Sequence, residues 1–278
     1  MEELVAQAKG GDRVALEELV SAVADDVYGL AIRMLWHPHD AEDATQEILV
    51  KVITNLGTFR GEAAFRTWVF RIAANHLIST RRRRAEQQEL SFEAFGADLA
   101  EGLDTRYDDG GVDESLLAEE VKIGCTQGML LCLDREHRAA YILGEVFELP
   151  SEQAAYVLGV TPAAYRKRLS RARTRIQSFM RGHCGLVDAE NACRCTRRIG
   201  RAVELGRLDP RDLLFAGRPA RTGPLRRSVA EMELLTDAAA VFRSHPDYRT
   251  PERVSAALRR LLESGRLGLL EAGELVID

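Results

Sequence analysis

The chain has 278 residues, of which 46% are hydrophobic and 6% aromatic, and its formal net charge is −5. This length suggests about two domains with packed cores, and the abundance of Ala, Leu, Arg and Glu favours an all-α protein. The amino terminus lacks an apolar secretory core, and no uninterrupted apolar run reaches the roughly 20 residues that span a bilayer. We therefore expect a soluble, cytoplasmic protein with no membrane partner.

The charges are arranged in blocks, so the net charge describes no single part of the chain. Residues 60–84 are rich in arginine and contain one acid, Glu62. Residues 85–120 carry many acidic side chains against Arg106 alone, and residues 151–181 are again strongly basic. The sequence therefore predicts two basic modules joined by an acidic connection.

Two amphipathic helices are predicted near the amino terminus. Apolar residues recur at helical spacing over 12–36, and a second apolar face runs from Ala41 to Leu56. Pro38 and Asp40 lie between them, where we expect them to end one helix and cap the next. The first turns of the second helix are crowded with polar side chains, namely Asp40, Glu42, Asp43, Gln46 and Glu47. Such carboxylates commonly stabilise a helix start, and a cluster this dense is also suited to docking a basic partner helix.

The loop 57–65 leads into a predicted long helix from Arg66 to about Arg84. Aromatic and basic side chains are interleaved there, a composition that can stack unpaired bases while neutralising phosphates. We expect most of these rings in the core and one or two facing nucleic acid. The candidate DNA-binding residues are Phe59, Arg60, Phe65, Arg66, Trp68, Arg71, Asn75, Arg81 and Arg82.

The middle of the chain reads as a connector followed by more helix. Residues 85–115 show no hydrophobic periodicity and combine glycines with acids, which predicts an acidic flexible linker. Helices resume near Leu116 and run, with a break, to Phe147. Cys125 and Cys132 lie in this part, and we expect them to be small buried apolar residues.

Residues 149–173 predict two short helices around a glycine-centred turn. Ser151 can cap the first helix, and Gly159 suits the left-handed residue that ends it. Thr161 can then cap the second helix, with Pro162 at its first position. The predicted apolar stripe of the second helix is Tyr165, Leu169, Ala172 and Ile176.

The outer face of this second helix is basic, and its candidate residues are Arg166, Lys167, Ser170, Arg171 and Arg173. An apolar back with a basic front is typical of a helix-turn-helix recognition helix, which meets phosphates and base edges in the major groove. A helical hairpin with a solvated charged face is the alternative that the pattern leaves open.

The tail, residues 182–278, contains four potential metal ligands in a short stretch, which are His183, Cys184, Cys193 and Cys195. One imidazole and three thiols suit a tetrahedral zinc ion, Zn²⁺, although the Cys-x-Cys spacing matches no common zinc signature. Redox sensing and unliganded thiols in a connector remain open as alternatives. Predicted helices near 196–207, 228–243 and 251–266 indicate a small helical extension with a regulatory role and no catalytic constellation.

Three stretches of this sequence, in this order, resemble an extracytoplasmic-function (ECF) sigma factor, the promoter-specificity subunit of bacterial RNA polymerase. They are residues 40–47, residues 58–78 with the arginines that follow, and residues 133–173. The resemblance covers roughly residues 10–180. It implies sigma region 2 at 1–84, the linker at 85–115, the region 4 helix-turn-helix at 116–181 and an additional Cys/His-containing extension at 182–278.

The resemblance also implies partners and roles. The acidic helix at 40–47 would bind core RNA polymerase, and the segment 59–84 would melt promoter DNA and capture an unpaired −10 base. The helix 162–175, together with Thr161 and Ala163 at its start, would bind the −35 element. No catalytic residue and no required cofactor are expected of such a subunit. Family members are often held by an anti-sigma factor, so this is a further partner to consider.

The chain departs from the family pattern at two places. Trp36-His37 stands where a small or polar turn is usual, and Tyr165 and Lys167 are unusual in the recognition helix. These departures bear on promoter sequence more than on role. The alternative function is a stand-alone helix-turn-helix regulator that senses metal or redox state through residues 183–195. A third possibility, a hydrolase or deaminase with a Cys/His zinc centre, is poorly supported. The chain lacks the Glu-containing ligand motif that those enzymes use.

Overall fold

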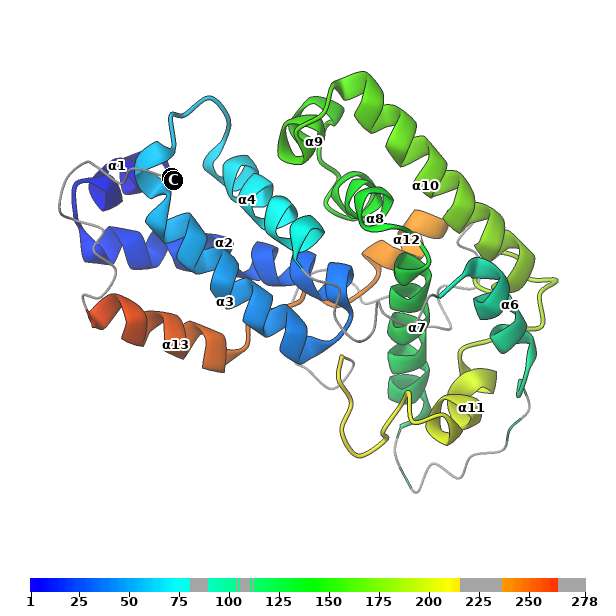
Figure 1. Ribbon diagram of the computed structural model, residues 1–278. Helices are drawn as coiled ribbons and strands as arrows, with labels where there is room; N and C mark the ends of the chain where they lie inside the picture. The colour runs from blue at the N-terminus through cyan, green and yellow to red at the C-terminus, as the bar shows by residue number, and fades with distance from the viewer. Residues whose placement is uncertain (81–89, 104, 106–110, 112, 216–236, 265–278) are drawn as a thin grey trace. The chain divides into compact units, whose positions relative to one another are not determined.

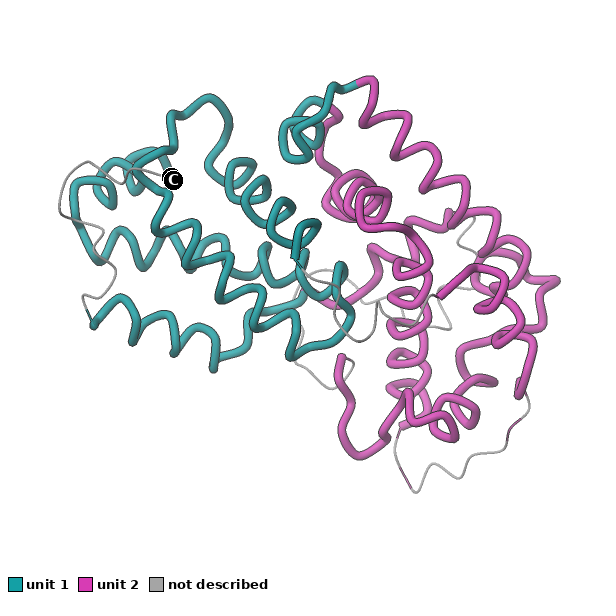
Figure 2. The backbone as a smooth tube through the Cα atoms, in the orientation of Figure 1, with its two compact units in different colours: residues 1–81, 152–162, 248–278 teal, residues 82–151, 163–247 magenta. Residues whose placement is uncertain are grey.

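The computed structural model describes residues 1–80, 90–103, 105, 111, 113–215 and 237–264 (Figure 1). Helices make up the fold in these ranges and no β-strand forms there, which confirms the predicted all-α class. The chain divides into two compact units, residues 1–81 with 152–162 and 248–278, and residues 82–151 with 163–247 (Figure 2). None of the described helices is long and apolar enough to cross a membrane.

The first unit is built around a long central helix. Its elements are α1 (Glu2–Lys9), α2 (Arg13–Leu35), α3 (Pro38–Thr54), η1 (Leu56–Thr58), α4 (Phe65–Ser79), α9 (Ser151–Leu158) and α13 (Glu252–Glu263). Helix α2 packs against α1, α3 and α4. Fully buried aliphatic side chains such as Leu19, Val27 and Ile48 fill the space between these helices. Each contributes about 1.5–3 kcal/mol relative to an exposed position, so this bundle is the rigid support of the surfaces described below.

The ends of α2 and α3 follow from local chemistry. Asp12 caps α2, because its carboxylate accepts from the backbone N–H groups of Val14 and Ala15 at 2.9 and 3.1 Å. The helix ends where Trp36 takes a left-handed φ of 67°. The expected cap at Asp40 is wrong, since α3 begins at Pro38, whose missing N–H costs nothing at a first position. Asp40 instead lies in the first turn, where its charge still favours the helix dipole.

The second unit is organised around α7. Its elements are α6 (Phe92–Ala100), α7 (Glu114–Leu131), α8 (Arg135–Tyr141), the π-helical turn η2 (Ile142–Val146), α10 (Pro162–His183), η3 (Thr196–Arg198), α11 (Ile199–Glu204) and α12 (Ala238–Arg243). Leu117 and Ala118 of α7 form a buried cluster with Ile199 and Leu208 of the tail. The tail is therefore partly built into this unit.

Part of the segment 85–115, predicted as a flexible linker, is helical. Ser91 caps α6 by accepting from Ala94 N–H at 3.1 Å, and the Phe95 ring stacks on Phe179 at a centroid distance of 5.6 Å. Gly128 of α7 lets this ring approach, because a Cβ there would lie 3.1 Å from Phe95. Phe92 also contacts Phe179, at a centroid distance of 5.2 Å. Phe92 and Phe95 thus give α6 an apolar face that the acidic composition of the segment does not reveal. This corrects the prediction for residues 92–100.

Candidate nucleic-acid and polymerase-binding sites

Helix α10 has the buried back and exposed front that its sequence predicts. Tyr165, Ala172 and Ile176 are fully buried, whereas Leu169 is half-buried. The Tyr165 hydroxyl donates to the carbonyl of Ala140 at 3.3 Å. The apolar stripe therefore fixes which face of α10 remains outside.

The candidate −35 residues lie on that outer face and are exposed, namely Thr161, Ala163, Arg166, Lys167, Ser170, Arg171 and Arg173. In the part of the chain that the structure describes, Arg166, Lys167 and Arg171 form no ion pair. Arg173 differs, because its Nε lies 3.1 Å from Oε1 of the buried Glu145. This hydrogen bond raises the pKa of Arg173. The available basic patch is therefore Arg166, Lys167 and Arg171.

The aromatic residues of the candidate −10 segment form one cluster. The Trp68 ring lies 5.3 Å from Phe59 and 5.7 Å from Phe65, and the two phenylalanines are edge to face at 5.5 Å. Phe65 is buried, whereas Phe59 and Trp68 are half-exposed. Trp68 and Phe59 are thus the rings of this cluster that a base can reach, and Phe65 supports them from the core.

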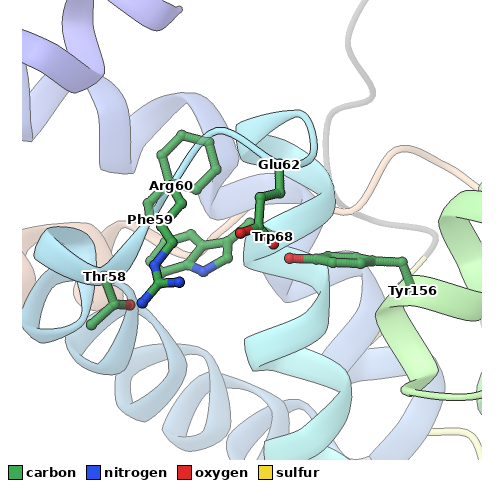
Figure 3. Close-up of a pocket in the computed structure, with 6 residues that line it drawn as sticks. All are labelled: Thr58, Phe59, Arg60, Glu62, Trp68 and Tyr156. Atoms are coloured by element: carbon green, nitrogen blue, oxygen red, sulfur yellow. The ribbon is translucent and has the colours of Figure 1, made fainter.

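Two pockets flank Trp68. The first, of about 270 Å³, is lined by Thr58, Phe59, Arg60, Glu62, Trp68 and Tyr156 (Figure 3). The second, of about 290 Å³, is lined by Lys51, Asn55, Thr58, Trp68, Ile72, Asn75, His76 and Ser79. Open space beside an indole, with amide, hydroxyl and basic groups around it, suits stacking and hydrogen bonding of an unpaired base. The sequence did not predict Lys51, Asn55 and Thr58, which precede the aromatic segment, or Glu62, which is an acid within a basic segment.

The arginines of the −10 segment have different environments. Arg66 is anchored by two bonds to Asp26, at 2.5 and 2.7 Å, which raise its pKa. Arg71 stacks over the Tyr156 ring at 4.7 Å, and Arg60 and Asn75 are exposed. The other two candidates, Arg81 and Arg82, lie outside the described residues. Arg60 and Asn75 are therefore placed to meet DNA without breaking a charge pair.

The candidate polymerase-binding residues of α3 lie on two sides of that helix. Asp43, Gln46 and Glu47 are exposed, Asp40 is half-exposed, and Glu42 is buried. A surface groove of about 390 Å³ is lined by Asp43, Gln46, Glu47, Val50 and Lys51. Asp43, Gln46 and Glu47 form the acidic rim of α3, and the apolar Val50 and the basic Lys51 complete the lining. Carboxylates next to an apolar side chain fit a basic amphipathic helix. The buried Glu42 faces α13 instead and pairs with Arg253.

Of the four predicted metal ligands, His183 is used in packing. Its ring stacks on Phe179 at 4.5 Å, and its Nδ1–H donates to the Phe179 carbonyl at 3.0 Å. Its Nε2 faces α6, because a Cβ on Gly96 would lie 2.7 Å from that nitrogen. His183 is thus held between α10 and α6 and does not face the cysteines that follow it.

A fourth cysteine, Cys125 of α7, interacts electrostatically with the three cysteines of the tail. The backbones of Cys184 and Cys193 pair in a parallel bridge, and Cys195 packs against the buried cluster that contains Leu117 and Ala118 of α7. Burial raises the pKa of Cys125 well above its ordinary value, and the charges of Cys184, Cys193 and Cys195 raise it further. The sequence reading missed Cys125 because it lies far away in the chain. As placed, no group of three or more His, Cys, Asp or Glu side chains in the described ranges is arranged to hold a metal ion.

Comparison with known proteins agrees with this arrangement. Residues 19–87 match Sigma-70 region 2, and residues 123–176 match Sigma-70, region 4. The chain is 31% identical over 183 residues to the RNA polymerase sigma-H factor of Pseudomonas aeruginosa, which covers 64% of this chain and 93% of that protein. It is also 31% identical over 179 residues to the ECF RNA polymerase sigma-E factor of Haemophilus influenzae, covering 63% and 92% of the two chains.

Among solved structures, the chain is similar to CnrH in complex with the cytosolic domain of CnrY. The TM-score is 0.47 and the identity 23%, over 64% of this chain and 96% of that one. The family matches end at residue 176, so the tail lies beyond them. The chain belongs to the ECF RNA polymerase sigma factors, the subunits that direct RNA polymerase to promoters.

Proposed function

We propose that the three surfaces divide the work of this sigma factor. The exposed face of α3 binds core RNA polymerase, the pockets beside Trp68 receive an unpaired base of the −10 element, and α10 reads the −35 element. The observation that carries this proposal is the exposed basic patch of α10, whose three side chains are directed outward by a buried apolar back. The protein works in the cytoplasm, where the polymerase is.

Helix α10 supplies the duplex contacts. Arg166, Lys167 and Arg171 are free of ion pairs within the described ranges, so they bind phosphates and base edges at no internal electrostatic cost. An arginine can bond a guanine in two places, which gives about 1–3 kcal/mol of discrimination. The anchored Arg173 instead fixes the helix to η2.

The Trp68 pockets supply the energy for strand opening. Extruding a base costs a few kcal/mol, and stacking on an aromatic ring returns about 1–3 kcal/mol per base. Polar groups such as Asn75 and Thr58 line the space next to the indole and can bond the exposed edge of the base. Opening therefore proceeds by binding energy alone, and no covalent step by this subunit is needed.

A transcription assay tests this division of labour. Core polymerase supplied with the full-length chain is expected to start at specific promoters, and substitution of the −35 bases should weaken this start. A stand-alone regulator would bind duplex DNA tightly and would not co-purify with polymerase. Failure to start transcription on every genomic fragment would contradict the proposal.

We also propose that an anti-sigma factor binds this chain, as is common in the family. The acidic rim of α3, together with Val50 in the same groove, is the surface that such a partner would share with the polymerase. Co-purification from the native cell, with and without an Asp43→Arg substitution, would identify the partner and this contact. Retention of the partner by the variant would exclude the rim as its site.

We propose in addition that Cys125, Cys184, Cys193 and Cys195 bind a zinc ion. Four thiolates are a complete tetrahedral donor set for a structural zinc site. The proposal is supported by the charges of Cys184 and Cys193, which raise the pKa of both Cys125 and Cys195. The described side chains are not arranged as a ligand group, so binding requires them to change position. A zinc ion there would join the tail to α7, next to the cluster around Leu117 and Ile199.

A further inference from the structure

Helix α13 of the tail lies against the helix that carries the candidate polymerase-binding residues. It packs on α2 and α3 within the first unit, alongside them in Figure 1. Val254 and Leu258 are its buried side chains. Most of its remaining surface is exposed or half-exposed. The tail therefore does not end in the second unit but returns to cover part of the first.

The centre of this contact is an ion pair between Arg253 and Glu42. The Arg253 guanidinium binds Oε2 of Glu42 and also lies 3.0 Å from Nδ1 of His39. The Glu42 side chain is only 6% exposed, and its second oxygen, Oε1, is buried and has no hydrogen-bond partner among the described residues. A buried carboxylate needs a cationic partner to offset its lost hydration. In this conformation Arg253 is that partner.

Polar contacts at both ends of α13 hold it in place. The N–H of Thr250 donates to Asp25 at 2.8 Å, and the Arg13 guanidinium donates to the Leu262 carbonyl at 2.9 Å. These contacts are exposed, and only two apolar side chains of the helix are fully buried. A short element held this way opens more readily than the core helices beneath it. Helix α13 can therefore leave α3 without unfolding the bundle.

We propose that α13 is an internal competitor of core RNA polymerase for α3. The inference rests on the proposed polymerase-binding role of α3. Arg253 gives Glu42 the basic partner that the polymerase otherwise supplies, while Asp43 and Glu47 stay exposed beside it. The chain then has two states: one with α13 docked and Glu42 occupied, and one with Glu42 available. The apparent association constant for polymerase is the intrinsic constant multiplied by the fraction of molecules in which α13 is undocked.

Two variants of the full-length chain release α13 in different ways. Arg253→Ala removes the ion pair, and Val254→Asp places a charge in the apolar contact. If α13 is docked in nine molecules of ten, each release raises the apparent affinity for core polymerase about tenfold. Arg260→Ala is the matched control, because it removes the same charge from an exposed position of the same helix. Affinity is measured by titrating labelled protein with core polymerase, and thermal unfolding confirms that each variant is folded.

A third variant separates the two proposals. Asp43→Arg with Glu47→Arg reverses charge on the exposed rim of α3 and should weaken binding to core polymerase. Unchanged binding by that variant means that the role of α3 is wrong. If the rim variant binds polymerase more weakly but Arg253→Ala and Val254→Asp do not bind it more tightly, α13 is not a competitor. The polymerase-binding role of α3 is then still supported. If Arg253→Ala does not fold, Val254→Asp decides, because it keeps Arg253, the partner of Glu42.

Discussion

Arg173 of α10 is bonded to Glu145 of η2, with Nε of the arginine 3.1 Å from Oε1 of the carboxylate. The Glu145 side chain is 11% exposed, whereas that of Arg173 is 52% exposed. The pair joins α10 to the π-helical turn η2. It also removes one arginine from the basic face that the sequence predicts, so that Arg166, Lys167 and Arg171 remain as the part of that face without an ion pair among the described residues.

Alanine at Arg166 or Arg171 should weaken promoter binding. An arginine that reads a guanine is worth about 1–3 kcal/mol, and one that contacts a phosphate changes the salt dependence by about one unit. Holoenzyme binding to a promoter fragment, measured at several salt concentrations, distinguishes these two cases. Folding stability should stay the same, because both side chains are exposed.

Arg173→Ala should have the opposite profile. Glu145 would keep its buried position without a partner, which lowers the free energy of unfolding by about 1–2 kcal/mol. The effect on promoter affinity should be smaller than that of Arg166→Ala. Thermal unfolding and promoter binding of the three variants provide the comparison. A loss of promoter affinity with unchanged stability would place Arg173 in the DNA contact instead.

Trp68→Ala should impair promoter opening more than promoter binding. The indole is half-exposed between two pockets, and its loss removes the stacking surface for an extruded base, worth about 1–3 kcal/mol. Transcription from a duplex promoter should fall, while transcription from a template opened in advance over the −10 region should be largely restored. Trp68→Phe keeps a ring and should retain most of the activity. An equal loss on both templates would assign Trp68 a purely structural role.

Zinc content decides the function of the cysteines. Wild-type protein should contain about one zinc per chain, and Cys193→Ser with Cys195→Ser should remove it. Cys125→Ser should also remove it, which tests the ligand that sequence reasoning missed. Cys132→Ser is the matched control, since this cysteine lies at the end of α7 and bonds the Gly128 carbonyl at 3.4 Å. Equal zinc in all four proteins would falsify the site.

The Cys132 thiol should make stability fall at alkaline pH. Burial raises its pKa from 9.0 to about 11, although the nearby charges of Arg175 and Arg138 lower it. The folded chain therefore holds this proton more tightly than the unfolded chain. The resulting stability is complete below pH 9 and is lost as the pH rises toward 11, by about 1–2 kcal/mol after solvent screening.

Urea unfolding of wild type and Cys132→Ala at pH 8, 9.5 and 10.5 checks this expectation. Other groups titrate in the same range in both proteins, so the difference between them isolates Cys132. The stability of the variant should change less between pH 9.5 and 10.5. Parallel curves for the two proteins would contradict the assignment.

Glu148→Gly should stabilise the chain slightly. Glu148 has a φ of 53°, a left-handed conformation that costs a residue with a Cβ about 1–2 kcal/mol. Glycine avoids this cost but loses more backbone entropy, so the expected net gain is about 0.5–1 kcal/mol. Its contact with Arg243 is long, at 3.9 Å, and exposed, so little is lost there. Glu152→Gly, in the first turn of α9, should destabilise by a similar amount. Thermal unfolding of both variants measures the two signs.

Local spacing was enough to predict much of this protein. The stripe of Tyr165, Ala172 and Ile176 is buried as its helical period requires. The turn at Gly159, with a φ of 63°, ends α9 where expected. The acidic start of α3 and the arginine-rich outer face of α10 also lie where the sequence places them. Each of these features depends on residues a few positions apart, which the chain itself holds together.

The remaining features depend on residues that are distant in sequence. The acidic composition of residues 92–100 did not predict α6. This helix is stabilised by contacts of Phe95 with Phe179 and Gly128, which are distant in sequence. No hydrophobic periodicity in the sequence predicts three other relationships. These are the Glu145–Arg173 pair, the Glu42–Arg253 pair and the interaction of Cys125 with the tail cysteines. The sequence by itself determined the helices that have a regular apolar period, their apolar faces and the family. Only the tertiary structure decided which charged side chains form ion pairs. An ion pair requires two opposite charges within a few ångström, and folding sets that distance whatever their separation along the chain.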